Sequence, residues 1–149
     1  MFKSFSFSNI YLLIQKLINF INSIFFLILT IGLTFALVLS PPDYIQGDSV
    51  RIMYVHVPAA WLGLACFSFI TFLSVLNFIF KIKNFYFINK SIAPIGLLFT
   101  CLAIITGSLW GQPTWGTWWA WDARLTSMLL LMFFYIFYIL TFKLLNKEE

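Results

Sequence analysis

The sequence predicts an all-α integral membrane protein with about four transmembrane helices. Of its 149 residues, 62% are hydrophobic and 9% are charged, whereas about a quarter of the residues in a soluble domain are charged. The apolar residues form four runs long enough to cross a hydrocarbon core, which takes about 20 helical residues. Because lipid offers no hydrogen bonds, each span must pair its own backbone groups, and this favours helices.

The four runs cover approximately residues 17–39, 52–80, 92–109 and 125–142. The first is longer than the apolar region of a signal peptide, about 7–15 residues, and no clear small-residue cleavage site follows it, so we interpret it as a retained span. Pro94 is expected in the first turn of the third span and Pro58 near the start of the second, where a missing N–H costs little. Since no repeat, soluble domain or linker separates the spans, residues 1–149 are predicted to form a single membrane domain. Small residues are available for close helix contact, namely Gly63, Ala65, Gly96 and Gly107.

The positive charges predict the orientation of the spans. Every lysine falls on one side of the predicted spans, at positions 3, 16, 81, 83, 90, 143 and 147. The two arginines, Arg51 and Arg124, fall on the other side. An excess of basic residues marks the cytoplasmic side, so we expect both termini in the cytoplasm or the mitochondrial matrix, and loops 40–51 and 110–124 outside. Basic residues that stand singly at the ends of apolar runs indicate a lipid bilayer as the surroundings and no nucleic-acid partner.

The most unusual segment is 110–122, which holds five of the six tryptophans between two predicted spans. An aromatic belt at the membrane surface explains one or two tryptophans in such a place, but not this concentration. Gly111, Pro113 and Gly116 suggest a shaped entry followed by a short helical piece lying in the interface. The spacing i, i+3, i+4, i+7 would then put one set of side chains on a single face, namely Trp115, Trp118, Trp119 and Asp122. Such a face suits a large planar apolar ligand.

Two residues on the predicted outer side have both functional and structural interpretations. His56, the single histidine of the chain, could be an axial ligand to haem iron, which requires a neutral imidazole. It could equally cap a helix end or hydrogen-bond a neighbouring loop. Asp122 could pair with Arg124 or cap the fourth helix.

Several other kinds of chemistry are excluded by the residue inventory. Cys66 and Cys101 lie inside apolar runs without CxxC spacing, so we interpret them as packing residues. There is no CxxCH motif for covalent haem attachment. One histidine and no exposed cysteine cannot complete a zinc site. Without a nucleophile–base pair, phosphate loop or carboxylate dyad, we expect no enzyme activity.

Two segments together resemble the haem-handling membrane proteins of cytochrome c biogenesis. The run 115–127, WGTWWAWDARLTS, resembles their tryptophan-rich WWD signature. Its ending, DARLTS, is similar to the haem exporter protein C branch (CcmC type), whereas synthetase-type relatives tend to have a proline after the aspartate. The run 50–61, VRIMYVHVPAAW, is similar to the first-histidine segment of the same branch. The resemblance covers nearly the whole chain.

The resemblance implies a protein that binds haem b transiently and non-covalently at the outer face of the inner membrane. It would deliver the haem to a membrane-tethered haem chaperone (CcmE type), beside an ABC-type ATPase, the membrane subunit of that ATPase and a small single-span accessory protein. His56 corresponds to an axial ligand of the haem iron. The haem- and chaperone-contacting segment corresponds to Trp115, Trp118, Trp119, Trp121 and Asp122. A bacterial inner membrane is implied, with the mitochondrial inner membrane as the alternative.

The chain departs from the family pattern in one respect. Family members have six spans and a second axial histidine in a third outer loop, whereas this sequence ends after its fourth predicted span. We therefore expect a fragment or split-gene product, with a shortened protein as the alternative, and labile haem binding with at most one ligand from this chain. Two other functions stay open: a truncated remnant that only inserts, and the permease subunit of an ABC-type haem exporter. A permease needs a polar pathway, for which the spans offer Thr71, Ser74, Asn77 and Thr106.

Overall fold

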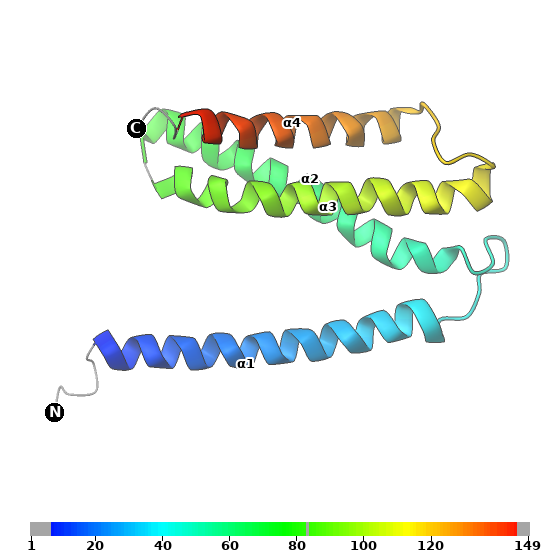
Figure 1. Cartoon of the computed structure of the whole chain (residues 1–149), viewed down its shortest axis with the longest axis horizontal. Helices are drawn as coiled ribbons and strands as arrows, with labels where there is room; N and C mark the ends of the chain where they lie inside the picture. The colour runs from blue at the N-terminus through cyan, green and yellow to red at the C-terminus, as the bar shows by residue number, and fades with distance from the viewer. Residues whose placement is uncertain (1–6, 83, 146–149) are drawn as a thin grey trace. The chain divides into compact units, whose positions relative to one another are not determined.

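The computed structural model describes residues 7–82 and 84–145, and this part of the chain is built from helices (Figure 1). The main helices are α1 (Phe7–Thr34), α2 (Val50–Phe80), α3 (Asn84–Trp115) and α4 (Ala123–Leu145). A π-helical turn, η2 (Phe35–Leu39), continues α1. All four main helices are long and apolar enough to cross a membrane. The prediction of an all-α integral membrane protein with four spans is therefore confirmed.

The chain divides into two compact units, Met1–Pro41 and Pro42–Glu149. The first contains α1 and η2, whose described side chains are exposed or half-buried. Its hydroxyl groups are nevertheless paired, because Ser23, Thr30 and Thr34 each donate to the backbone carbonyl four residues earlier, at 2.8–3.0 Å. A polar side chain that bonds its own helix in this way is tolerated in lipid.

In the second unit, α3 packs against both α2 and α4 through small residues. Gly63, Gly96 and Gly107 are buried, whereas Ala65 is exposed. A Cβ atom at Gly63 would lie 2.7 Å from Thr100 Oγ1, so α2 and α3 approach too closely there for any larger residue. The predicted close contact is thus confirmed for the three glycines and wrong for Ala65, which faces away from the neighbouring helices.

The buried core of this unit lies where the three helices meet, and consists of Ile70, Ala93, Leu131 and Tyr135. Tyr135 of α4 is fully buried, and its hydroxyl donates a 2.7 Å hydrogen bond to the carbonyl of Gly63 in α2. Residues of α2 and α4 therefore contact each other in this core, and the tyrosine links the two helices by a hydrogen bond.

The helices extend beyond the apolar runs that predicted them, because polar residues at a membrane boundary continue a helix as well as apolar ones do. α3 begins at Asn84 and ends at Trp115, so Pro94 lies inside the helix rather than in its first turn, and Pro58 likewise lies inside α2. α3 stops where Gly116 adopts the left-handed conformation, φ 74°, and donates its N–H to the carbonyl of Gln112 at 3.0 Å. This is a common way to end a helix.

The α2–α4 unit has two ends, which are named here by their residues. The tryptophan end carries the loop 42–49 before α2 and the loop 116–122 between α3 and α4. The lysine end carries Lys81 after α2, Lys90 near the start of α3 and Lys143 near the end of α4.

Candidate functional site

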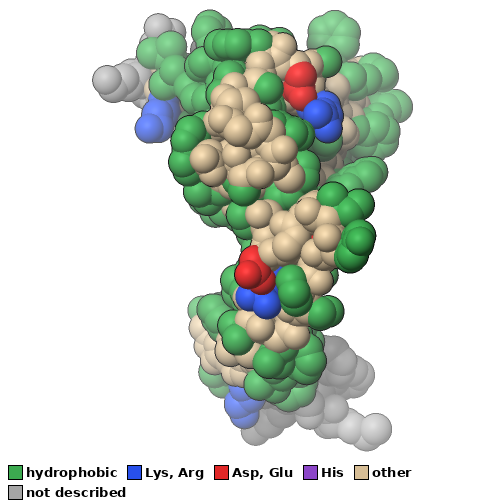
Figure 2. All heavy atoms as spheres, turned by 90° about the vertical axis from the view of Figure 1, so that its right-hand side faces the viewer, with side chains coloured by type: hydrophobic (Ala, Val, Ile, Leu, Met, Phe, Trp, Pro, Cys, Tyr) green, Lys and Arg blue, Asp and Glu red, His purple; other side chains and the backbone are tan. Residues whose placement is uncertain are grey.

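The tryptophan end presents acidic and basic side chains in adjacent pairs (Figure 2). Its first loop is a tight turn, in which the backbone groups of Asp43 and Gly47 exchange hydrogen bonds of 2.9 and 3.0 Å. The Asp43 carboxylate accepts the N–H groups of Gln46 and Ile45, which hold the pKa of this aspartate below its usual value. Gln46 in turn accepts a 3.0 Å hydrogen bond from the indole N–H of Trp110, which ties the loop to α3.

His56 lies about two turns into α2 and faces α3 rather than a loop. Its Nδ1 atom is 2.9 Å from the carbonyl oxygen of Ala103 and 3.2 Å from the hydroxyl oxygen of Thr106. The Thr106 hydroxyl donates its own hydrogen to the carbonyl of Leu102 at 2.7 Å, so toward His56 it acts as an acceptor. Because a carbonyl can only accept, Nδ1 must carry the proton. In a neutral imidazole with this tautomer, the lone pair is on the other ring nitrogen, Nε2.

Gly107 makes room for this ring. A Cβ atom at that position would lie 2.9 Å from His56 Cε1, closer than real side-chain contacts, and 3.3 Å from Nδ1. The imidazole is therefore held between α2 and α3, at half-buried exposure, with a defined tautomer. Of the two structural alternatives predicted for His56, helix capping and bonding to a loop, neither is observed; the partner is the backbone of α3.

The predicted short helix in the tryptophan segment is wrong. Trp110 and Trp115 belong to α3, and residues 116–122 are not helical, so Trp115, Trp118, Trp119 and Asp122 do not share a helical face. The cause is local. Gly116 turns the chain out of the helix, and the hydroxyl of Thr117 then donates to the carbonyl of Trp119 at 2.9 Å, which fixes a turn in place of a helix.

The indoles form edge-to-face pairs rather than a single flat surface. Trp110 and Trp115 have ring centroids 4.9 Å apart, and Trp119 and Trp121 have centroids 5.6 Å apart. Trp118 is 59% exposed and Trp121 is 79% exposed, so broad apolar faces remain uncovered. The indole Nε1 of Trp119 is buried and has no hydrogen-bond partner among the described residues.

Asp122 has the two structural roles that its position suggested. One carboxylate oxygen accepts the N–H of Leu125 at 2.8 Å and thereby caps α4, and the other pairs with Arg124 at 2.9 Å. The Leu125 N–H, and after it the Arg124 side chain, hold the pKa of Asp122 below its usual value. Arg124 also lies over the ring of Trp115, with its Cζ atom 5.3 Å from the ring centroid. Asp122 thus positions the arginine that covers this tryptophan.

The fold connects three of the six predicted site residues, His56, Trp115 and Asp122, through α3 and Arg124. His56 packs on α3 at Gly107, Trp110 follows one turn later, and Trp110 contacts Trp115, which contacts Arg124. Trp118, Trp119 and Trp121 lie in the loop beyond. Three contributors were not among the predicted site residues: the Ala103 carbonyl, Gly107 and Trp110. Trp110 stands within the tryptophan segment, and Gly107 is one of the small residues predicted for close helix contact. Nothing in the sequence points to the Ala103 carbonyl, which contributes through packing between helices.

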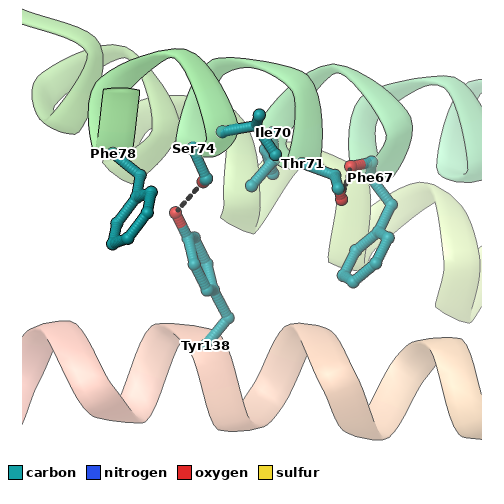
Figure 3. Close-up of a pocket in the computed structure, with 7 residues that line it drawn as sticks. Phe67, Ile70, Thr71, Ser74, Phe78 and Tyr138 are labelled. Atoms are coloured by element: carbon teal, nitrogen blue, oxygen red, sulfur yellow. Dashed lines mark hydrogen bonds between the residues drawn. The ribbon is translucent and has the colours of Figure 1, made fainter. Parts of the chain in front are cut away.

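The polar residues considered as a transport pathway are mostly engaged inside the protein. A pocket of about 400 Å³ between α2 and α4 is lined largely by apolar side chains, with Ser74 and Tyr138 facing each other across it at 3.4 Å (Figure 3). Thr71 donates to the carbonyl of Phe67 in its own helix, and Ser74 also accepts from Asn89 at 3.0 Å. No charged residue lines this pocket, so it lacks the charge that a pathway for an ionic solute would favour.

Comparison with known proteins identifies consistent relatives. The family model for heme exporter protein C matches residues 1–149. Heme exporter protein C of Haemophilus influenzae is 44% identical over 109 residues, which are 73% of this chain and 44% of that protein. Heme exporter protein C of Bradyrhizobium diazoefficiens is 46% identical over 110 residues, 74% of this chain and 41% of the relative. A ccmC-like mitochondrial protein of cytochrome c biosynthesis from Marchantia polymorpha is 48% identical over 97 residues, which are 65% of this chain and 42% of that protein. The aligned part of the chain covers less than half the length of each of these relatives.

Proposed function

The chain belongs to the heme exporter protein C family, and from this premise we propose that it binds haem at its tryptophan end and presents it for cytochrome c maturation. Its four apolar helices and its relatives place it in an inner membrane, that of a bacterium or of a mitochondrion. Haem is here the cargo, and we assign no reaction chemistry to the chain.

The observation that carries the proposal is the contact between His56 Nδ1 and the Ala103 carbonyl oxygen. Metal-ligating histidines almost always donate their second ring N–H to a carboxylate, a carbonyl or water, which orients the ring and raises its basicity. His56 has this arrangement already, with Nδ1–H on the Ala103 carbonyl at 2.9 Å. Its Nε2 lone pair suits the iron of haem. The donor set therefore fits the cargo.

The tryptophan residues supply the second part of the site. The exposed faces of Trp115, Trp118 and Trp121 offer large apolar surfaces on which a porphyrin can pack. The unpartnered indole N–H of Trp119 offers a hydrogen-bond donor to a carboxylate, and haem carries two propionates. Since a buried donor without a partner is costly, a ligand carboxylate there would stabilise both partners.

A protein that delivers haem must also release it, and we propose that this site binds haem weakly enough for release. One histidine from this chain and exposed indoles would hold haem without burying it, so that an acceptor can approach. Because affinity differences between related complexes reside mainly in the dissociation rate, weak ligation favours transfer. We propose as acceptor a membrane-tethered haem chaperone of the CcmE type. An ABC-type ATPase, its membrane subunit and a small single-span accessory protein are proposed to act beside it.

The test is haem binding by the purified full chain in detergent. We expect added hemin to give a shifted Soret band, and His56→Ala to change the position of that band because the axial ligand is lost. Replacing both Trp118 and Trp119 by alanine should weaken binding by on the order of tenfold, because each aromatic contact contributes about 0.5–1.5 kcal/mol.

Trp61→Ala provides a matched control, because this tryptophan is 71% exposed on α2 and lies outside the tryptophan segment. Binding that is unchanged in the control and altered in the two site variants supports the proposal. Equal effects in all three variants, or a stable spectrum of two histidine ligands from the chain alone, would refute it.

A further inference from the structure

A second candidate binding site lies at the lysine end, in a groove between α3 and α4. It has a volume of about 520 Å³ and is lined by Lys90 and Pro94 of α3 and by Ile139, Phe142 and Lys143 of α4. The two lysines are separated along the chain by most of α3 and all but the last residues of α4. Because the helices run in opposite directions, they bring both ammonium groups to one apolar groove.

Neither lysine has an acidic partner in the part of the chain that the structure describes. The described carboxylates are those of Asp43, Asp48 and Asp122, and all three belong to the tryptophan end. Lys90 and Lys143 are both exposed. Two cations that share a groove repel each other, so an anion between them would remove this repulsion.

The apolar wall of the groove is held in place. Phe142 makes edge-to-face contacts with Tyr86 and Tyr138, with ring centroids 4.9 and 4.8 Å apart. Pro94 has a ring of fixed geometry and is exposed. The groove therefore combines a preformed apolar surface with two cations at the membrane boundary.

We propose that this groove binds a phospholipid with a net negative headgroup. The lipid phosphate would lie between the ammonium groups of Lys90 and Lys143, and the upper part of an acyl chain would pack on Pro94, Ile139 and Phe142. Basic pockets between transmembrane helices on the inner side of a membrane are suited to such headgroups. A free phosphate ion would use the cations but not the apolar wall, and this difference favours a lipid.

The test is lipid retention by the full chain, measured by native mass spectrometry in detergent. Phosphatidylglycerol and phosphatidylcholine with identical acyl chains are added separately. We expect the wild-type chain to retain phosphatidylglycerol preferentially. Lys90→Gln and Lys143→Gln should each reduce this preference by on the order of fivefold, since a lysine near an anionic lipid surface contributes about 1 kcal/mol.

A charge-matched control is the double variant Lys16→Gln/Lys81→Gln, which removes two lysines of the same predicted side that are not among the residues lining the groove. Loss of preference in the Lys90→Gln/Lys143→Gln double variant but not in the control supports the site. An equal loss in both double variants would show general charge attraction and overturn the proposal, as would a wild-type chain without preference.

Phe142→Ala separates a lipid from a free anion. Weaker phosphatidylglycerol retention in this variant, with both lysines present, supports contact with an acyl chain. Retention that survives Phe142→Ala but is displaced by millimolar inorganic phosphate would show an anion site without lipid specificity. Equal far-ultraviolet circular dichroism of all variants confirms that each one is folded.

Discussion

At the scale of single residues, the most consequential contact is that between His56 and the α3 backbone. The Ala103 carbonyl determines which ring nitrogen carries the proton, and Gly107 provides the space in which the ring lies. A histidine that is free in a loop would exchange between tautomers and orientations. Here α2 and α3 hold the His56 ring in one orientation, which lowers the entropy lost when a ligand binds.

We therefore expect Gly107→Ala to weaken hemin binding although it leaves the proposed iron ligand, His56, in the chain. The new Cβ would lie 2.9 Å from His56 Cε1, so the ring must move. Displacement of packed side chains costs about 1–3 kcal/mol, and hemin binding should weaken by about tenfold in a Soret titration. Gly32→Ala is the control, since nothing lies within 4 Å of a Cβ there. Unchanged hemin affinity in the Gly107 variant would contradict this role.

A second residue-scale prediction concerns Asp122 and pH. Its pKa is lowered in the folded protein by the Leu125 N–H and by Arg124, so protonation opposes the capped state. The stabilisation is complete above the pKa of the unfolded chain, about 3.9. It declines as the pH falls below that value and is lost below the folded pKa.

Carboxyl NMR titration of the detergent-solubilised chain, with Asp122→Asn to assign the signal, should give a midpoint for Asp122 below the ordinary aspartate value. Arg124→Gln should raise this midpoint but leave it below the ordinary value, because the Leu125 N–H remains. A midpoint at or above the ordinary value in the unmodified chain would exclude the cap.

At the scale of helices, glycine determines how closely α3 approaches its neighbours. Thr100 of α3 faces Gly63 of α2, and Gly96 of α3 faces Tyr135 of α4. The tyrosine hydroxyl then reaches past α3 to the Gly63 carbonyl at 2.7 Å. The three helices are thus linked by one buried hydrogen bond and two close contacts.

Gly96→Ala should therefore destabilise the α2–α4 unit. A Cβ at this position would overlap the Tyr135 hydroxyl, and that side chain is fully buried and hydrogen-bonded, so it cannot move away freely. We expect a loss of about 1–3 kcal/mol, seen as earlier thermal unfolding in detergent. Gly32→Ala serves again as the control and should leave the transition unchanged or slightly higher, because alanine favours helix. Equal unfolding temperatures of the two variants would show that the contact between Gly96 and Tyr135 does not contribute to stability.

At the scale of the whole molecule, the remaining question is which way the chain crosses the membrane. The charge pattern predicts the lysine end inside and the tryptophan end outside. In a chain with Cys66 and Cys101 replaced by alanine, Tyr44→Cys should react with a membrane-impermeant maleimide in intact spheroplasts, since Tyr44 is fully exposed in the loop before α2. Lys81→Cys should react only after permeabilisation. The reverse labelling pattern would invert the orientation and with it the proposed delivery side.

The fold class, the number of spans and the two segments of the candidate site could all be predicted from the amino-acid sequence. Each of these depends on local composition: a run of apolar residues must be helical in lipid, and a tryptophan cluster is visible without coordinates. The short helical piece predicted to put Trp115 and Asp122 on one face is not formed, because a left-handed Gly116 and the turn at Thr117 end the helical pattern.

The contacts of His56 and the pairing of the indoles could not be predicted, because they depend on how the chain folds in three dimensions. The carbonyl that selects its tautomer belongs to Ala103, 47 residues away, and the contact depends on the register of α2 against α3. That register follows from which glycines meet which side chains, as at Gly63 and Thr100. The groove between Lys90 and Lys143 has the same origin, because antiparallel packing brings together charges that are far apart in the chain. Composition is a local property and can be read directly, whereas register is a property of two helices together and requires the fold.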